Sequence, residues 1–167
     1  NYPITWVSGP AGSGKTTLVS SYLDARRLPC LWYQVDERDS DIATFFYYMG
    51  LAGRKAAPRK RTSLPLLTPE YLQGVSTFAL RYFENLFSRL KVPYILVLDN
   101  YHWVHSGSNF HEVISEGLSA IPNGIHVALI SRHDLPPALS RLHANGLIGM
   151  LGWDELRLTP EESFEIA

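Results

Sequence analysis

Residues 9–16 read Gly9-Pro10-Ala11-Gly12-Ser13-Gly14-Lys15-Thr16. This stretch matches G-x-x-x-x-G-K-[ST] at every fixed position. The apolar run Ile4–Ser8 before it predicts a buried strand, and Thr16–Arg26 after it predicts a helix. Glycines let successive backbone N–H groups turn inward around a phosphate, and the helix N-terminus adds its dipole. The stretch therefore predicts a phosphate-binding loop between a strand and a helix.

The loop residues have separate expected roles in holding a nucleotide and a metal ion. We expect the Lys15 ammonium to reach the β- and γ-phosphates and the Thr16 hydroxyl to ligate Mg²⁺. The residues expected to bind the nucleotide are Gly9, Pro10, Ala11, Gly12, Ser13, Gly14, Lys15, Thr16 and Thr17.

A second apolar run, Ile95–Leu98, ends at an acid, Asp99. In open α/β sheets ligands gather at the carboxyl ends of the strands. We therefore expect Asp99 to lie near Mg²⁺ and to form the metal site with Thr16. Capping of the following loop is the alternative role for this carboxylate.

The residue after Asp99 is Asn100, where many ATPases with this kind of sheet have a second carboxylate. Asparagine can orient a water molecule but cannot accept its proton at neutral pH. The pair predicts slow hydrolysis or a base from elsewhere. The substitute candidates are Asp36, Glu37, Asp39 and His102, although a solvated acidic turn and a loop histidine are the more common roles for such residues.

Arg132 follows the predicted strand Ile125–Ile130 and completes the expected catalytic set of Lys15, Asp99, Asn100 and Arg132. A guanidinium at this edge of a sheet suits recognition of a γ-phosphate. The alternative is an exposed arginine that ends a strand.

The rest of the chain alternates strands with helices. Further strands are expected at Leu31–Val35 and within Leu147–Leu158. Helices are expected after a cap at Asp39 or Ser40, from Thr68 to Leu90, over Phe110–Ile121 and over Pro137–Ala144, with residues 52–67 irregular. Leu18, Val19 and Tyr22 share one face of the first helix. This order predicts an α/β fold, a three-layer α/β/α P-loop NTPase with a mainly parallel five-stranded sheet.

Composition excludes several classes of protein. The 167 residues carry 15 Lys+Arg and 16 Asp+Glu, a balance that disfavours a wholly basic nucleic-acid binder. Hydrophobic residues make up 46%, which is enough for a core. No apolar run approaches the roughly 18–20 residues that span a bilayer, so no membrane partner is expected.

Residues 54–61 contain five basic residues in eight, for which a solvated loop is favoured because aromatic residues for stacking are missing.

Near the end of the chain, Thr159-Pro160-Glu161-Glu162 resembles a helix start with a capping box. The following helix would have only about two turns, which is marginal alone. We therefore expect a fragment of a longer protein, with a nucleotide-binding domain at 1–158 and the start of a truncated helical domain at 159–167.

Five segments together resemble the nucleotide-binding domain of STAND ATPases, and within them the large LuxR-type regulators of the maltose-activator kind. These segments are Val7–Leu18, Trp32–Asp41, Ile95–His102, Ile130–Pro136 and Leu156–Glu162. The resemblance implies a switch that rests with ADP and self-associates when inducer and ATP bind. A cytoplasmic location is expected because the single cysteine, Cys30, fits a reducing compartment. It implies DNA binding only through a domain absent from this chain. The family often has two acids where this chain has Asp99-Asn100, which puts fast turnover in doubt.

Three functions remain open on the sequence. The first is an ATP- or ADP-binding switch module with Mg²⁺ and weak ATPase activity, part of a signal-responsive transcriptional regulator. The second is a non-hydrolysing, nucleotide-dependent assembly or scaffold module, favoured by Asn100. The third is a small-molecule phosphotransferase, which needs an arginine-rich lid, for which residues 54–61 are the candidate.

Overall fold

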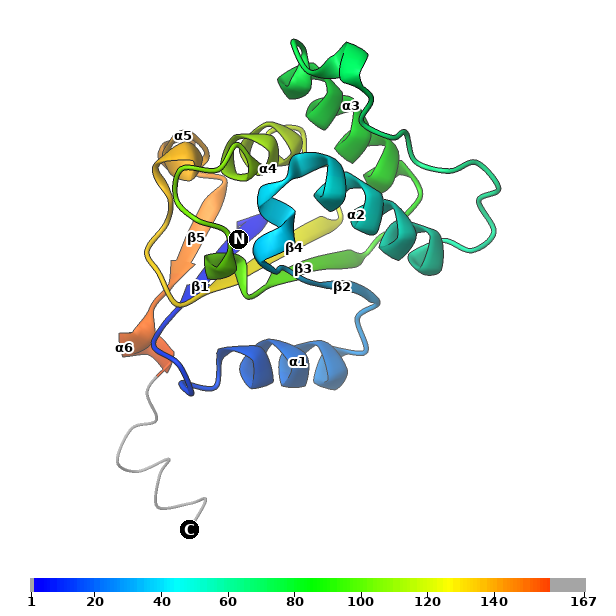
Figure 1. Ribbon diagram of the computed structural model, residues 1–167. Coiled ribbons are helices and arrows are strands. Elements are labelled where there is room, and N and C mark those ends of the chain that lie inside the picture. Colours follow the sequence, from blue (N-terminus) through cyan, green and yellow to red (C-terminus); the bar gives the residue numbers. More distant parts are fainter. Residues whose placement is uncertain (1, 157–167) are drawn as a thin grey trace.

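The computed structural model describes residues 2–156, which form one parallel sheet with helices on both faces (Figure 1). The sheet has five strands in the order β2-β3-β4-β1-β5, and every neighbouring pair is parallel. The strands are β1 (Ile4–Ser8), β2 (Cys30–Gln34), β3 (Tyr94–Asp99), β4 (Ile125–Ser131) and β5 (Ile148–Leu151). The predicted α/β fold with a parallel five-stranded sheet is confirmed.

The helices are distributed unevenly over the two faces of the sheet. In Figure 1 α1 lies below the sheet, and the other long helices lie above it. The helix below is α1 (Lys15–Arg26); those above are α2 (Ile42–Ala56), α3 (Val75–Ser88), α4 (Phe110–Leu118) and α5 (Ser140–Ala144). A further short helix, α6 (Trp153–Leu156), follows β5 and was not expected from the sequence.

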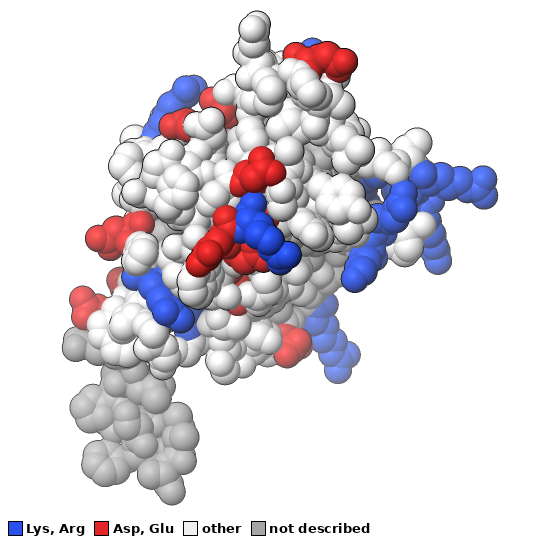
Figure 2. All heavy atoms as spheres, viewed as in Figure 1, with Lys and Arg blue, Asp and Glu red and all other residues white. Residues whose placement is uncertain are grey.

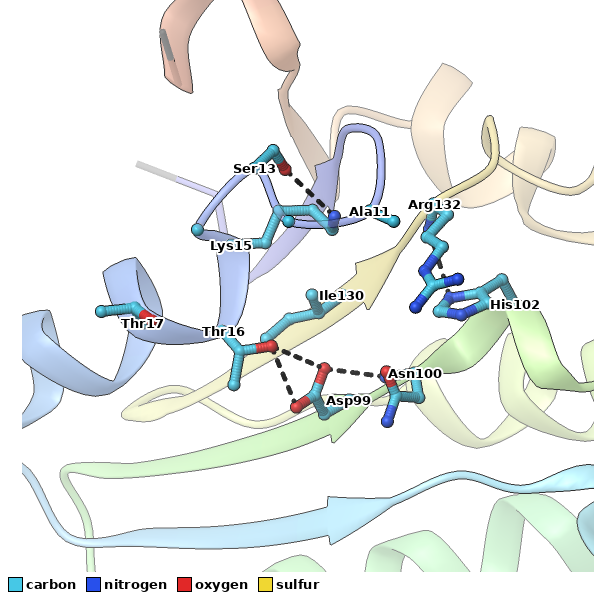
Figure 3. A pocket seen from close by; sticks show the side chains of 12 residues that line it. Ala11, Ser13, Lys15, Thr16, Thr17, Asp99, Asn100, His102, Ile130 and Arg132 are labelled. Atoms are coloured by element: carbon cyan, nitrogen blue, oxygen red, sulfur yellow. Dashed lines mark hydrogen bonds between the residues drawn. The ribbon is translucent and has the colours of Figure 1, made fainter. Parts of the chain in front are cut away.

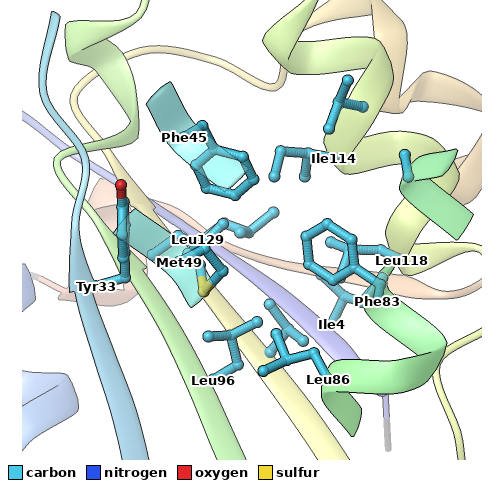
Figure 4. Packing of buried hydrophobic residues seen from close by; sticks show 14 of the residues in the cluster. Ile4, Tyr33, Phe45, Met49, Phe83, Leu86, Leu96, Ile114, Leu118 and Leu129 are labelled. Carbon is cyan, nitrogen blue, oxygen red and sulfur yellow. The ribbon is translucent and has the colours of Figure 1, made fainter. Parts of the chain in front are cut away.

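The main hydrophobic core lies between the sheet and the helices above it (Figure 4). Phe45, Phe83, Leu96 and Leu129 in this cluster are fully buried. β3 is buried along its whole length, as expected for a central parallel strand covered on both faces. A smaller cluster on the α1 side contains Val7, Leu23, Ile95, Val97 and Ile130.

Helix α1 covers its face of the sheet only in part. Leu18, Val19 and Tyr22 line a groove between α1 and the strands, and Leu18 and Tyr22 are about half exposed. The predicted shared face of these three residues is therefore present, but Leu23 is the apolar residue of α1 that is fully buried.

The predicted start of α2, on the other face of the sheet, is wrong. Asp41, not Asp39 or Ser40, caps α2, and its carboxylate accepts a hydrogen bond from Thr44 N at 3.2 Å. Asp39 instead belongs to a 3₁₀ turn at Glu37–Ser40, in which it and Asp36 cap each other's backbone. The acidic turn offers several capping residues in a row, so the sequence did not distinguish between them.

The segment between α2 and α3 also differs from the prediction. α2 continues to Ala56, so part of the stretch predicted as irregular is helical. The helix expected from Thr68 begins at Val75, because residues Pro69–Tyr71 form only a 3₁₀ turn and Gly74 has non-helical dihedral angles, φ −127° and ψ 37°. Glycine weakens helix continuity here, and Leu72 consequently lies on the surface.

The C-terminal prediction lies outside the described residues: the helix start at Thr159 and the boundary between 1–158 and 159–167 both follow residue 156. Within residues 2–156, no helix combines the length and apolar character needed to cross a membrane.

Candidate nucleotide-binding site

Residues 9–14 form the loop between β1 and α1, at the carboxyl edge of the sheet. Gly12 and Gly14 have φ angles of +73° and +83°, a conformation that favours glycine over residues with a side chain. At Gly9 a Cβ would lie 3.0 Å from the hydroxyl of Ser13, so the loop leaves little room there. The backbone conformation thus favours glycine at positions 12 and 14, and the approach of the Ser13 side chain favours it at position 9.

The Lys15 side chain folds back over this loop (Figure 3). Its Nζ donates hydrogen bonds to Gly9 O and Pro10 O, both at 2.7 Å, and to Ser13 Oγ at 3.1 Å. Burial and the nearby Arg132 guanidinium lower the pKa of Lys15, while the Asp99 carboxylate opposes this effect. The loop therefore holds a partly desolvated ammonium group whose hydrogen-bond partners are all neutral oxygens.

Thr16 and Asp99 meet across the gap between α1 and β3. The Thr16 hydroxyl lies 3.2 and 3.3 Å from the two carboxylate oxygens of Asp99, which is 2% exposed. A hydroxyl and one carboxylate fit the way Mg²⁺ is usually held, with further ligands from substrate phosphates and water. Among residues 2–156 no group of three or more His, Cys, Asp or Glu side chains forms an all-protein metal cage.

These side chains line one pocket of about 300 Å³. It lies where the loops after β1, β3 and β4 converge, so it brings the predicted residues Lys15, Asp99, Asn100 and Arg132 together (Figure 3). Its lining consists of Ala11, Gly12, Ser13, Gly14, Lys15, Thr16, Thr17, Asp99, Asn100, His102, Ile130 and Arg132. Gly9 and Pro10 are not in the lining; their carbonyl groups hold Lys15.

The acidic candidates for a substitute base do not line this pocket. Asp36 forms an ion pair with Arg38 at 2.6 Å, and Asp39 accepts a hydrogen bond from the Tyr33 hydroxyl at 2.7 Å. Burial raises the pKa of Asp39. Both carboxylates are thus engaged within the acidic turn, and Glu37 is also outside the pocket lining.

His102, the remaining candidate base, does line the pocket. Its Nδ1 accepts a hydrogen bond from the backbone N–H of Arg132 at 3.2 Å. Burial lowers the pKa of His102, and the charges of Arg132 and Lys15 act in the same direction. The ring is therefore neutral at pH 7, with its proton on Nε2 and its basic nitrogen already occupied.

One site residue, Gln34, was not predicted. Its Nε2 donates to Asp99 Oδ2 at 3.2 Å, and its Oε1 accepts from Asn100 Nδ2 at 2.8 Å. The parallel register places Gln34 directly opposite Asp99 at the ends of β2 and β3. A polar residue at the carboxyl end of the predicted strand Leu31–Val35 was the available signal.

Over nearly its whole length the chain is similar to curated transcriptional regulators. The chain is 31% identical over 166 residues to the HTH-type transcriptional regulator MalT of Serratia proteamaculans and 28% identical to that of Yersinia enterocolitica. Each match covers 98% of this chain and 18% of the relative. This domain has a P-loop NTPase fold and resembles MalT-type regulators. No protein-family model matches it.

Solved structures support the same fold for this domain. A Walker-type ATPase of Pyrococcus abyssi aligns with a TM-score of 0.53 at 18% identity, covering 99% of this chain and 52% of that one. The structure of Drosophila ORC bound to AT-rich DNA and Cdc6 aligns with a TM-score of 0.53 at 15% identity, covering 99% and 53%. The resemblance to STAND-class regulators noted in the sequence is confirmed by the MalT matches, and the P-loop fold by these structures.

Proposed function

We propose that this domain is a nucleotide-controlled switch that binds ATP or ADP with Mg²⁺ and hydrolyses ATP slowly. The observation that carries the proposal is the single pocket that joins the glycine loop, the Lys15 ammonium and the Thr16–Asp99 pair. The glycine loop supplies N–H groups, Lys15 supplies a cation, and the α1 dipole favours an anion at the same point.

In this proposal the nucleotide phosphates lie against residues 9–17, with Lys15 moving from its loop carbonyls to the β- and γ-phosphates. Mg²⁺ is held by Thr16 and, through water, by Asp99, and when bound it neutralises charge on the phosphates. Arg132 lines the same pocket and contacts the γ-phosphate.

Slow hydrolysis follows from the residues that face the terminal phosphate. Asn100 lines the pocket where a second carboxylate would act as base, and an amide cannot accept a proton at neutral pH. His102 lines it as well, but the Arg132 N–H occupies its basic nitrogen. Water can be oriented at this site, but a free general base is not supplied by these two residues.

The role of the whole protein is carried over from its relatives. The chain spans 18% of the length of the MalT regulators that it matches. We therefore place it within a cytoplasmic, signal-responsive transcriptional regulator, which self-associates in the ATP-bound form and contacts DNA through other parts of the protein.

A non-hydrolysing assembly module is the second candidate, because Asn100 removes the usual base. The phosphotransferase is less well supported. Its lid candidate, residues 54–61, lies outside the pocket lining, at the C-terminal end of α2. Arg89 donates hydrogen bonds to the carbonyl oxygens of the adjoining residues Thr62 and Ser63. Arg89 lies between the end of α3 and the start of β3, so the basic stretch lies at the amino edge of the sheet.

Calorimetric titration with Mg-ATP and Mg-ADP tests the proposal. We expect saturable binding in the parent, a loss of at least about tenfold in Lys15→Ala and no change in Lys91→Ala, an exposed lysine outside the pocket. Phosphate release measured on the same samples separates slow turnover from none. Equal binding by the parent and Lys15→Ala would contradict the proposed site.

A further inference from the structure

Two side-chain amides, those of Gln34 and Asn100, form a hydrogen-bonded series that begins at Asp99. Gln34 Nε2 donates to Asp99 Oδ2 at 3.2 Å, and Asn100 Nδ2 donates to Gln34 Oε1 at 2.8 Å. The backbone N–H of Asn100 donates to the other carboxylate oxygen of Asp99 at 2.8 Å. The series crosses from the end of β3 to the end of β2 and back.

The chemistry of Asp99 fixes the direction of every hydrogen bond in this series. An ionised carboxylate only accepts, so the Gln34 amide must present its nitrogen to Asp99. The Gln34 amide oxygen then faces Asn100, so Asn100 must donate a hydrogen bond to it from its own amide nitrogen. Turning either amide by 180° would place two acceptors against each other without a proton between them.

Because the Asn100 amide nitrogen faces Gln34, the Asn100 amide oxygen faces away from Gln34. In Figure 3 the Asn100 amide nitrogen points away from the loop and Lys15, and the amide oxygen lies on the side of His102 and Arg132. Asn100 is a lining residue of this pocket. Its backbone has a φ of +59°, a conformation that asparagine adopts more readily than most residues.

We propose that Gln34 is a positioning residue, which transmits the orientation set by Asp99 to Asn100 and so holds Asn100 Oδ1 toward the nucleotide pocket as a hydrogen-bond acceptor. The proposal rests on the proposed function and deepens it. An acceptor at this place repels phosphate oxygens but receives a hydrogen bond from a water molecule next to them. Asn100 therefore orients water beside the terminal phosphate and does not contact the phosphate itself.

The first test measures the amides without any nucleotide. We would record the side-chain NH₂ signals of the ¹⁵N-labelled 167-residue chain and assign them with Asn100→Ala and Gln34→Leu; the chain has only two glutamines, Gln34 and Gln73. In Gln34→Thr and Gln34→Leu, the Asn100 NH₂ signals shift and exchange with solvent at least about tenfold faster. Gln73→Thr, the same change at an exposed glutamine, leaves them in place.

The second test measures turnover of Mg-ATP in a double-mutant cycle. Gln34→Thr lowers kcat by about 10- to 100-fold, the usual effect of removing a group that orients a functional residue, and leaves the Mg-ADP dissociation constant within about twofold. Because Gln34 acts through Asn100, the double variant with Asn100→Ala is no slower than Asn100→Ala alone.

The outcomes separate the inference from the proposed function. Unchanged Asn100 signals in both Gln34 variants, or fully additive effects on kcat, overturn the role of Gln34. A chain that shows the expected amide signals but binds neither nucleotide overturns the proposed function instead, since the amide measurement needs no ligand.

Discussion

The Thr16 hydroxyl lies 3.2 Å from Asp99 Oδ2, although 83 positions separate the two residues in the chain. Parallel packing produces this contact, because it places the start of α1 and the end of β3 at the same edge of the sheet. β3 and β1 each pair with β4, so the loop after β1 faces the carboxylate at the end of β3 across one strand. The contact joins the two halves of the proposed magnesium and phosphate site.

Arg132 is expected to distinguish ATP from ADP. It lines the same pocket as Lys15, and its charge acts on that ammonium group, so we expect it to reach a γ-phosphate bound there. A hydrogen bond to a charged group contributes about 1.5–3 kcal/mol, so Arg132→Ala should weaken Mg-ATP binding by about 10- to 100-fold and Mg-ADP binding little. Calorimetry on both nucleotides measures this, with the exposed Arg141→Ala as control. Equal losses for both nucleotides would count against a γ-phosphate contact.

Gly117 is expected to be intolerant of a side chain for packing reasons. A Cβ at this position in α4 would lie 2.2 Å from Phe83 Cδ2 of α3, and the Phe83 ring is fully buried. Overpacking of this kind costs typically 1–3 kcal/mol, so Gly117→Ala should lower the free energy of unfolding by about that amount. Denaturant unfolding measures it.

The matched control for Gly117→Ala is Gly74→Ala, since a Cβ at Gly74 meets nothing within 4 Å. We expect that variant to stay within about 0.5 kcal/mol of the parent. Combining Gly117→Ala with Phe83→Leu removes the ring that causes the clash, and the two effects should be less than additive. An equal loss in the Gly74 and Gly117 variants would show that the α3–α4 contact is not the cause.

His111 makes the stability of the fold dependent on pH. Its ring is 5% exposed, with Nδ1 3.2 Å from the Tyr101 hydroxyl and Nε2 2.9 Å from the carbonyl oxygen of His105. Burial lowers the pKa of His111. The folded state therefore binds fewer protons than the unfolded state, in which the pKa of a histidine is about 6.5. Stability from this group is complete above that value and is lost as the pH falls through the lowered pKa.

Denaturant unfolding at pH 7.5 and pH 5.5 measures this effect. We expect the parent to lose stability between the two values and His111→Gln to lose less, with His143→Gln, an exposed site, behaving as the parent. Should the His111 variant keep the full pH dependence, another group is responsible.

The sequence predicts some elements of this fold more accurately than others. The strands β1 to β4 were placed to within about one residue, because buried parallel strands are continuous apolar runs, whereas β5 was expected only somewhere within Leu147–Leu158. The caps of α2 and the start of α3 were wrong, because several adjacent residues can cap and because Gly74 interrupts a helical apolar pattern. At both places, neighbouring residues favour different starts of the helix to a similar degree.

In the site, too, some residues could be predicted from the sequence and others could not. The glycine loop, Asp99, Asn100 and Arg132 follow strand ends that the sequence marks, and the structure places them in one pocket. Gln34 was missed because its role depends on the register of β2 against β3, which places it opposite Asp99. His102 was considered as a base, and only the backbone contact with Arg132 shows which ring nitrogen is occupied.

The central claim is that one pocket holds the nucleotide phosphates and Mg²⁺ together. The most direct measurement is the dissociation constant of ATP with Mg²⁺ and with EDTA, for the parent and for Asp99→Asn. We predict that Mg²⁺ tightens binding by about tenfold or more in the parent, and that Asp99→Asn loses most of this gain, because the site then lacks its carboxylate. The account would be contradicted if the dissociation constant of ATP for the parent were the same with Mg²⁺ and with EDTA, or if Mg²⁺ changed it equally in the parent and in Asp99→Asn.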